Sequence, residues 1–200
     1  MPTADTCWAF LIRNERATMK KITTNLDDCL VLEPVVHGDD RGFFIESWNS
    51  RTFDELGLDL KFVQDNHSRS SQGVLRGLHF QLNTPQGKLV RVTRGSVFDV
   101  AVDLRRSSTT YGNWFGTELS ESNKRMLWVP PGFAHGFLVL SDFADFQYKC
   151  TEYYSQKDDR GIRWDDPKIG IEWPLPDGFE PLLSDKDRDA PELARSETFE

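Results

Sequence analysis

The stretch Val97-Phe98-Asp99-Val100-Ala101-Val102-Asp103-Leu104 is the clearest β-strand in the sequence. Large apolar residues occupy every second position in it, which is the period-two pattern of a strand with one face in a protein core. Residues 89–93, just before it, alternate in the same way, and the turn-forming pair Arg94-Gly95 separates the two stretches. Two alternating stretches joined by so short a turn predict a β-hairpin.

More strand-like stretches follow towards the C-terminus, at residues 128–129, 137–140 and 143–154. In the last of them one face carries Ala144, Phe146, Tyr148 and Cys150. Short strands at close spacing, separated by turns, are typical of an antiparallel sandwich or barrel. We expect only short helices, one at residues 50–56 and one from Asp185 onward, in a charged tail whose composition predicts a largely solvated end.

The composition fits one all-β domain. The chain has 200 residues and a mass of 23.0 kDa, and its 14 Phe, 6 Trp, 14 Gly and 10 Pro favour short strands and tight turns. We expect residues 19–200 to form this domain, including the charged tail, and residues 1–18 to be an N-terminal extension without fixed structure.

Charge and cysteine content restrict the partners and the compartment. The net charge is −8, which disfavours a nucleic-acid polymer because phosphate binding needs a basic face. No apolar run approaches the about 18 residues of a membrane span, so we expect no membrane segment. The 3 cysteines are too few and too scattered for a disulfide framework or a thiolate zinc site, which predicts free thiols in a reducing cytoplasm.

The 4 histidines differ in their surroundings. The sequence around His37 predicts a surface turn. His67 follows a polar cluster, and its position fits a turn as well as it fits a functional site. His79 lies in a strand-like stretch, and His135 lies between Ala and Gly in an apolar stretch. Each of the two could be either a hydrogen-bonded core histidine or a functional histidine. Strict alternation places Arg76 and His79 on opposite strand faces, and Gly77 between them would allow the bulge that a shared site requires.

Residues near His79 predict chemistry without a metal. A metal-binding barrel offers a second histidine two positions after the first, whereas this chain has Gln81 there and Lys88 nearby, which would repel a divalent ion. A histidine, a lysine and an inward phenol at Tyr148 suit removal of a proton next to a carbonyl. A base takes the proton, a cation stabilises the enolate oxygen, and an acid on the other face returns a proton, which inverts the carbon centre.

Eight motifs occur in order along the chain: Asp40-Arg41-Gly42-Phe43-Phe44-Ile45-Glu46, Gln64-Asp65-Asn66-His67-Ser68, Leu75-Arg76-Gly77-Leu78-His79-Phe80-Gln81, Gly87-Lys88-Leu89-Val90-Arg91-Val92, Pro131-Gly132-Phe133-Ala134-His135-Gly136-Phe137, Tyr148-Lys149-Cys150-Thr151, Gly161-Ile162-Arg163-Trp164-Asp165-Asp166-Pro167 and Leu183-Ser184-Asp185-Lys186-Asp187. In these motifs the sequence resembles the dTDP-4-dehydrorhamnose 3,5-epimerase family, from about Met19 to Asp187. The resemblance implies a cupin-type antiparallel β-barrel, or jelly roll, with a few short helices. It also implies a homodimer with shared active sites and no metal or other cofactor. The implied reaction inverts C3 and C5 of dTDP-4-dehydro-6-deoxy-D-glucose to give dTDP-4-dehydro-L-rhamnose.

The resemblance also implies a role for each matching residue. His79 matches the general base, Tyr148 the general acid, Asp187 the carboxylate that orients the histidine, and Lys88 the cation at the C4 oxygen. Substrate-binding positions are matched by Arg41, Glu46, Gln64, Asn66, Arg76, His135, Asp159 and Lys186. Among these, Arg41 and Arg76 match contacts to the diphosphate, and the segment with Arg41 and Glu46 would come from the neighbouring subunit.

Two departures from the family pattern concern the site. The family often has Glu where this chain has Asp159, whose side chain is one methylene shorter, and the segment from His79 to Lys88 is one residue shorter than in many members.

Three alternatives remain open at this point: an epimerase that inverts only C3 or C5 of a related dTDP-4-keto-6-deoxy sugar, a dTDP-sugar 3,4-ketoisomerase, and a cupin that only binds a sugar nucleotide. An inward Tyr148 argues against the second.

Overall fold

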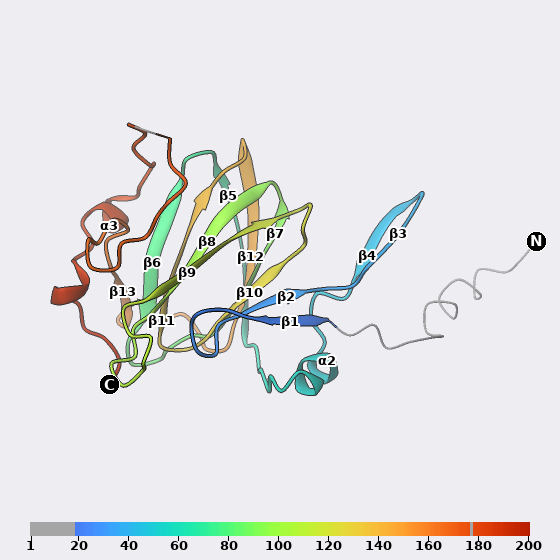
Figure 1. Ribbon diagram of the computed structural model, residues 1–200, viewed down its shortest axis with the longest axis horizontal. Helices are drawn as coiled ribbons and strands as arrows, with labels where there is room; N and C mark the ends of the chain where they lie inside the picture. The colour runs from blue at the N-terminus through green and yellow to red at the C-terminus, as the bar shows by residue number, and fades with distance from the viewer. Residues whose placement is uncertain (1–18, 177) are drawn as a thin grey trace, which may run out of the picture.

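The computed structural model describes residues 19–176 and 178–200 (Figure 1). The extension expected at residues 1–18 lies outside the described residues. Along the chain the elements are β1 (Lys20–Thr23), β2 (Leu30–Glu33), β3 (Val36–Asp39), β4 (Gly42–Ile45), α2 (Ser50–Glu55), β5 (Gln64–Ser71), β6 (Leu75–Gln81), β7 (Lys88–Arg94), β8 (Ser96–Asp103), β9 (Trp114–Ser120), β10 (Met126–Val129), β11 (Phe133–Val139), β12 (Phe143–Cys150), β13 (Asp159–Gly161), α3 (Asp185–Arg188) and the 3₁₀ turn η2 (Leu193–Arg195). The predicted all-β class and both predicted helices are confirmed.

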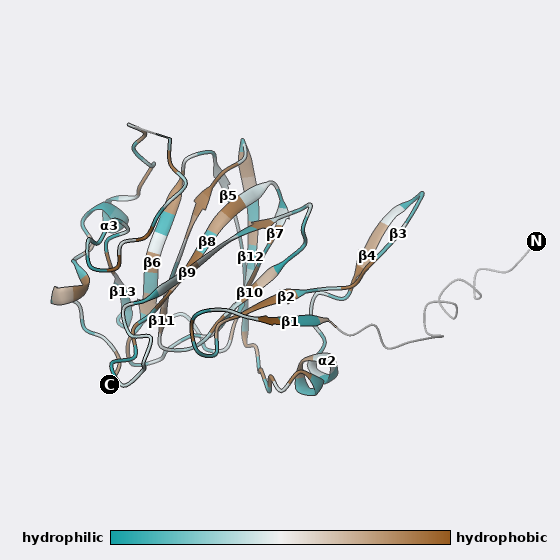
Figure 2. Cartoon of the chain, viewed as in Figure 1, coloured by the Kyte–Doolittle hydropathy of each residue, from teal (hydrophilic) through white to brown (hydrophobic). Residues whose placement is uncertain are grey.

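Two antiparallel sheets form the body of the protein. One has six strands in the order β1-β2-β10-β7-β12-β5, and the other has five in the order β13-β6-β11-β8-β9. The main core lies between them, because apolar residues of both sheets join one buried cluster, among them Val90, Phe146, Ala101 and Phe137. In Figure 2, β8 is largely hydrophobic, whereas α3 at the surface is largely hydrophilic. The predicted alternation on β12 is confirmed, with Ala144, Phe146 and Cys150 buried.

The predicted hairpin of residues 89–104 is wrong. β7 pairs with β10 and β12, whereas β8 pairs with β11 and β9, so the two strands belong to different sheets. Gly95, with φ +76°, carries the chain from one sheet to the other. The physical reason lies in the shared core: Val92 and Val97, on either side of this turn, are buried in the same cluster from opposite sheets.

The outer face of each sheet is also covered. Behind the six-stranded sheet, Phe53 of α2 packs with Leu32 and Trp128. Behind the five-stranded sheet, Ile162, Ile169 and Leu193 of the C-terminal segment pack on Val100 and Val102. The expectation of a largely solvated tail therefore fails for its end, because Phe199 also packs edge-on against Phe80, with ring centroids 5.7 Å apart.

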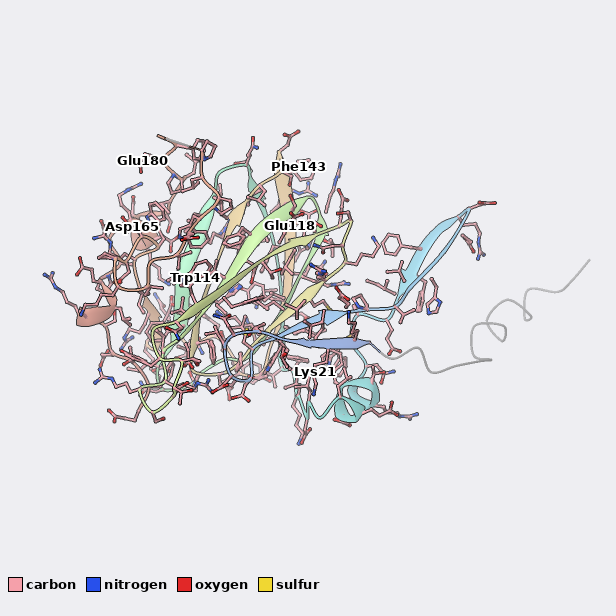
Figure 3. All side chains as sticks on the ribbon, viewed as in Figure 1. Lys21, Trp114, Glu118, Phe143, Asp165 and Glu180 are labelled. Carbon is pink, nitrogen blue, oxygen red and sulfur yellow. The ribbon has the colours of Figure 1, made fainter. Side chains whose placement is uncertain are left out.

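The hairpin of β3 and β4 stands apart from both sheets (Figures 1 and 3). Its strands pair with each other in a separate two-stranded sheet. Phe43 is 61% exposed and Phe44 is 53% exposed, while the ammonium group of Lys124 lies 3.8 Å from the centre of the Phe43 ring. The hairpin thus presents two aromatic side chains away from the core of its own chain.

A β-bulge on β6 is built around Gly77. His79 pairs with His135 and Arg76 pairs with Phe137, so three steps along β6 match two along β11. Gly77 has φ +121°, and a Cβ there would lie 2.6 Å from the Gly136 Cα and 2.7 Å from the His135 carbonyl oxygen. The bulge predicted at Gly77 is confirmed.

Substituting Gly77 should test how strongly the fold depends on this bulge. We expect Gly77→Ala to lower the free energy of unfolding by about 3 kcal/mol, because a Cβ would meet backbone atoms that cannot move aside and because the φ is strained. Gly57→Ala is the matched control: Gly57 has φ +78° with nothing near its Cβ position, so about 1 kcal/mol is expected. Equal losses in urea unfolding would show that the close approach is unimportant.

Candidate active site

A cavity of about 250 Å³ opens at one end of the space between the two sheets. Its lining residues come from β6, β7, β12, β13, α3 and two loops: His79, Phe80, Gln81, Gln86, Lys88, Tyr148, Tyr154, Asp159 and Lys186. Five of the residues predicted from the sequence therefore meet here, and a sixth, Asp187, bonds to one of them.

His79 forms a pair with a buried carboxylate. Its Nε2 lies 2.5 Å from Oδ1 of Asp187, which is 4% exposed. The other oxygen of Asp187 accepts a hydrogen bond of 2.8 Å from the Ser184 hydroxyl. Burial raises the pKa of Asp187, but the hydrogen bonds from His79, Ser184 and the backbone N–H of Gly77 outweigh it and hold that pKa below its usual value. Since the ionised carboxylate only accepts, Nε2 of His79 is the donor in this pair, and Nδ1 is the ring nitrogen on the other side.

Lys88 lies at the start of β7, on the opposite sheet from His79. Its Nζ is 3.5 Å from the His79 carbonyl oxygen. Burial lowers the pKa of Lys88, and the neighbouring charge of Asp159 partly offsets this. A partly desolvated ammonium group is well suited to attract developing negative charge on a ligand.

Tyr148 faces the cavity from β12, also in the six-stranded sheet. It packs beside Phe146, with ring centroids 6.0 Å apart. Burial raises the pKa of Tyr148, so the phenol keeps its proton at neutral pH. The site thus has a proton acceptor on one sheet and a proton donor on the other.

At the rim, Asp159 is the centre of a small polar group. The ammonium group of Lys186 pairs with its Oδ2, and the Tyr154 hydroxyl donates to the same oxygen at 3.1 Å. Tyr154, Gln81 and Gln86 line the cavity but were not among the predicted site residues. Tyr154 would share the face of Tyr148 if the strand ran on to residue 154 as predicted, but β12 ends at Cys150.

His135 lies beside the cavity rather than in its lining. Its Nε2 is 3.0 and 3.1 Å from the two oxygens of Asp99, and both side chains are buried. Burial raises the pKa of Asp99, and the interactions with His135 oppose this. The ring of His135 stacks on Phe146 at 6.0 Å. This histidine is therefore a hydrogen-bonded core residue directly opposite His79 on the neighbouring strand.

Three further predicted residues border the same inner space. Gln64 donates to Asn66 at 3.0 Å on β5, and Asn66 is the direct neighbour of Tyr148 across the sheet. Arg76 donates to the hydroxyl of Ser70 on β5 at 3.0 Å, so it points towards the opposite sheet, as His79 does. The bulge at Gly77 is what lets Arg76 and His79 face the same way.

Two predicted residues are far from the cavity within this chain. Arg41, at the tip of the β3–β4 hairpin, pairs with Asp39. Glu46 accepts hydrogen bonds from Asn49 and Thr52 at the start of α2. The structure does not bring either residue to His79.

Metal-ligating groups do not gather in the part of the chain that the structure describes: residues 19–176 and 178–200 contain no cluster of three His, Cys, Asp or Glu side chains. Within the same residues, no helix is long and apolar enough to cross a membrane.

Two antiparallel sheets with acid–base groups facing the space between them define an enzyme of the cupin type. The chain belongs to the dTDP-4-dehydrorhamnose 3,5-epimerase family, whose family model matches residues 23–195. It is 55% identical to the dTDP-4-dehydrorhamnose 3,5-epimerase of Pseudomonas aeruginosa over 182 residues, which are 90% of this chain and 99% of that protein.

Solved structures with the same fold include two with bound sugar nucleotides. The dTDP-6-deoxy-D-glucose-3,5-epimerase of Legionella pneumophila, in complex with dTDP-4-keto-L-rhamnose, matches with a TM-score of 0.86 and 50% identity over 90% of this chain and 95% of that one. A 3'-monoepimerase from Streptomyces bikiniensis, in complex with dTDP-quinovose, matches with a TM-score of 0.80 and 35% identity over 86% of each chain.

Removing the charge of Asp187 should destabilise the protein in a pH-dependent way. Since folding lowers this pKa, the ionised group stabilises the fold above its unfolded value of about 3.9, and this contribution is lost as the pH falls through the lower folded value. We expect Asp187→Asn to cost about 1–3 kcal/mol at pH 7, with the difference shrinking below about pH 4. Urea unfolding from pH 7 to 3 measures it. Asp185→Asn, on the exposed side of α3, should change little, and an equal loss there would contradict the assignment.

Proposed function

We propose that this protein inverts C3 and C5 of dTDP-4-dehydro-6-deoxy-D-glucose and so forms dTDP-4-dehydro-L-rhamnose. One observation carries the proposal: the His79–Asp187 pair and the protonated Tyr148 face a single cavity from opposite sheets. An inversion needs this arrangement, because the proton must leave from one face of the carbon and return on the other. Family membership supports the choice of substrate, and so does the Legionella pneumophila relative, which is bound to dTDP-4-keto-L-rhamnose, the proposed product.

The chemistry begins with the C4 ketone, which acidifies the hydrogens on both neighbouring carbons. Nδ1 of His79 takes the proton from one of these carbons, and the electron pair of the broken C–H bond moves to the C4 oxygen as an enolate. Lys88 stabilises the negative charge there. Tyr148 then donates its proton to the opposite face of the carbon, and the ketone forms again. His79 then gives its proton to water and Tyr148 takes one from water, and the same steps at the second carbon complete the reaction without a metal or cofactor.

The remaining predicted residues are proposed to bind the substrate. Arg76, with Gln64 and Asn66, lies along the inner space beyond Tyr148, where a guanidinium group suits the diphosphate. Asp159 and Lys186 lie at the rim beside the sugar, and His135 supports the pocket from behind. Although Asp159 is shorter than Glu, it reaches both Tyr154 and Lys186.

We propose a cytoplasmic homodimer in which the β3–β4 hairpin completes the partner's site. The exposed Phe43 and Phe44 and the distance of the hairpin from its own cavity support this arrangement. It would bring Arg41 and Glu46 to the nucleotide of the neighbouring subunit. The buried free thiols of Cys29 and Cys150 suit a reducing compartment.

Inversion of a single carbon is the second candidate function. The similarity to the 3'-monoepimerase of Streptomyces bikiniensis favours it, although that identity of 35% is lower than the 50% to the Legionella pneumophila enzyme. The position of Tyr148 disfavours a 3,4-ketoisomerase. A protein that only binds sugar nucleotides would not need the whole set of His79, Lys88, Tyr148 and Asp187.

Deuterium labelling separates these functions. In deuterated water, with a strong chelator present, we expect the protein to place deuterium at both C3 and C5 of dTDP-4-dehydro-6-deoxy-D-glucose, because each inversion returns a proton from a solvent-exchanged group. Nuclear magnetic resonance of the sugar measures the label. Label at one carbon would support the single-carbon enzyme, and no label would refute both. Loss of activity that only added metal restores would refute the metal-free mechanism.

Variants of His79 and Tyr148 should affect different steps. We expect His79→Ala to abolish deuterium exchange at both carbons. Tyr148→Phe should slow completed inversion by about 10²–10⁴-fold, the usual contribution of a positioned acid, while removal of the first proton is less affected. Tyr111→Phe, at the surface away from the cavity, is the control and should match the unaltered protein. Near-normal exchange in His79→Ala would show that another group is the base.

A further inference from the structure

Two loops meet at the mouth of the cavity and are joined to each other. Residues 82–87 connect β6 to β7, and residues 151–158 connect β12 to β13. Gln86 donates to the Glu152 carbonyl at 2.8 Å, while Gly87 N–H donates to the Thr151 hydroxyl at 2.8 Å. The Thr151 N–H also donates to the Gly87 carbonyl at 3.0 Å. These contacts hold the bases of the loops together but do not reach Tyr154.

Gln81 holds the second loop on both sides of Tyr154. Its Nε2 donates to the Tyr153 carbonyl at 3.1 Å and to the Thr84 carbonyl at 2.8 Å, and its Oε1 accepts from the Ser155 N–H at 2.6 Å. Gln81 is 4% exposed. Both of its N–H groups and its carbonyl oxygen therefore have partners, as a buried amide requires. A side chain used in this way is not available as a metal ligand.

The strand that carries Gln81 is the strand that carries His79. The two residues are two positions apart on β6, and both line the cavity. β6 is paired with β11 on one side and with β13 on the other. The backbone from which its side chains project is therefore held in place on both sides. Gln81 consequently ties the backbone around Tyr154 to the same rigid element that positions His79.

Tyr154 depends on such support because it has little packing of its own. Its side chain is largely exposed, at 56%, yet it lines the cavity and donates to Asp159. Its own N–H donates to Oε1 of Gln64 at 2.9 Å. A second buried anchor lies nearby, since the Asp158 carboxylate accepts from Asn83 at 2.7 Å and from the Ser155 hydroxyl at 2.7 Å.

We propose that Gln81 is a positioning residue that holds Tyr154, and through it Asp159, at the mouth of the cavity so that the sugar of a bound sugar nucleotide is enclosed beside His79. The choice of ligand in this statement rests on the proposed function. Gln81 acts on the part of the site that surrounds the sugar. The nucleotide would lie further along β5, where its one described link to the Tyr153–Ser155 backbone is the hydrogen bond from the Tyr154 N–H to Gln64.

The test compares Gln81→Met with the unaltered full-length protein. Methionine keeps the length and volume of the side chain but loses its hydrogen bonds to Thr84, Tyr153 and Ser155, of which the last two hold the loop of residues 151–158. We expect amide hydrogen exchange in residues 151–158 to become about tenfold faster, as the loss of two neutral hydrogen bonds predicts for local opening. The KM for dTDP-4-dehydro-6-deoxy-D-glucose should rise about tenfold, whereas the dissociation constant for dTDP alone should change less than threefold.

Gln72→Met is the matched control, because Gln72 also donates to a backbone carbonyl, that of Leu140 at 3.0 Å, but in the turn between β5 and β6. It should leave amide exchange in residues 151–158, KM and dTDP binding unchanged. Gln81→Asn keeps the amide group on a side chain one methylene shorter, which cannot reach all the partners of Gln81 at once, so its effects should lie between those of Gln81→Met and the unaltered protein. It also provides a folded variant if Gln81→Met does not fold.

Three outcomes would overturn the proposal: unchanged amide exchange in residues 151–158 of a folded Gln81 variant, an unchanged KM, or an equal loss of affinity for dTDP alone. Failure of the proposed function is recognised separately. If the unaltered protein places no deuterium in the sugar, the ligand is wrong, while the exchange of residues 151–158 still decides whether Gln81 holds the loop.

Discussion

The hydrogen bond between His79 and Asp187 joins residues that are 108 positions apart in the chain, and much of the structure serves to form it. A carboxylate that is 4% exposed is ionised only if its oxygens accept hydrogen bonds from nearby donors. Asp187 meets this condition with three donors: His79, the Ser184 hydroxyl and the backbone N–H of Gly77. Ser184 is the N-cap of α3, so the short helix and the carboxylate are positioned together.

The same hydrogen bond explains why the β-bulge of β6 matters beyond local geometry. The bulge turns Arg76 towards the opposite sheet, and the N–H of Gly77 within it becomes a donor to Asp187. A regular strand would direct Arg76 to the outer face and pair that N–H with β11. The irregularity therefore supplies both an inward guanidinium group and a donor for the buried carboxylate, and the close contact of Gly77 with Gly136 explains why glycine occupies both positions.

Local patterns in the sequence predicted β6, β7, β8, β10, β11 and the inner face of β12, because alternation reports directly which side chains are buried. They did not predict how strands divide between sheets: a β7–β8 hairpin fits the local pattern, but Val92 and Val97 are buried in one cluster from strands of opposite sheets. The motif resemblance named most of the cavity residues. Gln81 and Tyr154 were not predicted as site residues, because their positions at the cavity depend on hydrogen bonds to loop backbone, which leave no periodic signal.

The distribution of charge reconciles an acidic chain with an anionic ligand. Several surface cations are paired with carboxylates, such as Arg69 with Asp145 and Arg163 with Asp165. In contrast, Arg76 donates to the neutral hydroxyl of Ser70, and the half-buried Lys88 donates to the backbone carbonyl of His79. Burial disfavours the ammonium form of Lys88, so an anion arriving beside it regains that lost free energy. An enolate oxygen gains more from this than the neutral ketone does, which is how a lysine that the fold has desolvated can favour the charged intermediate over the bound substrate.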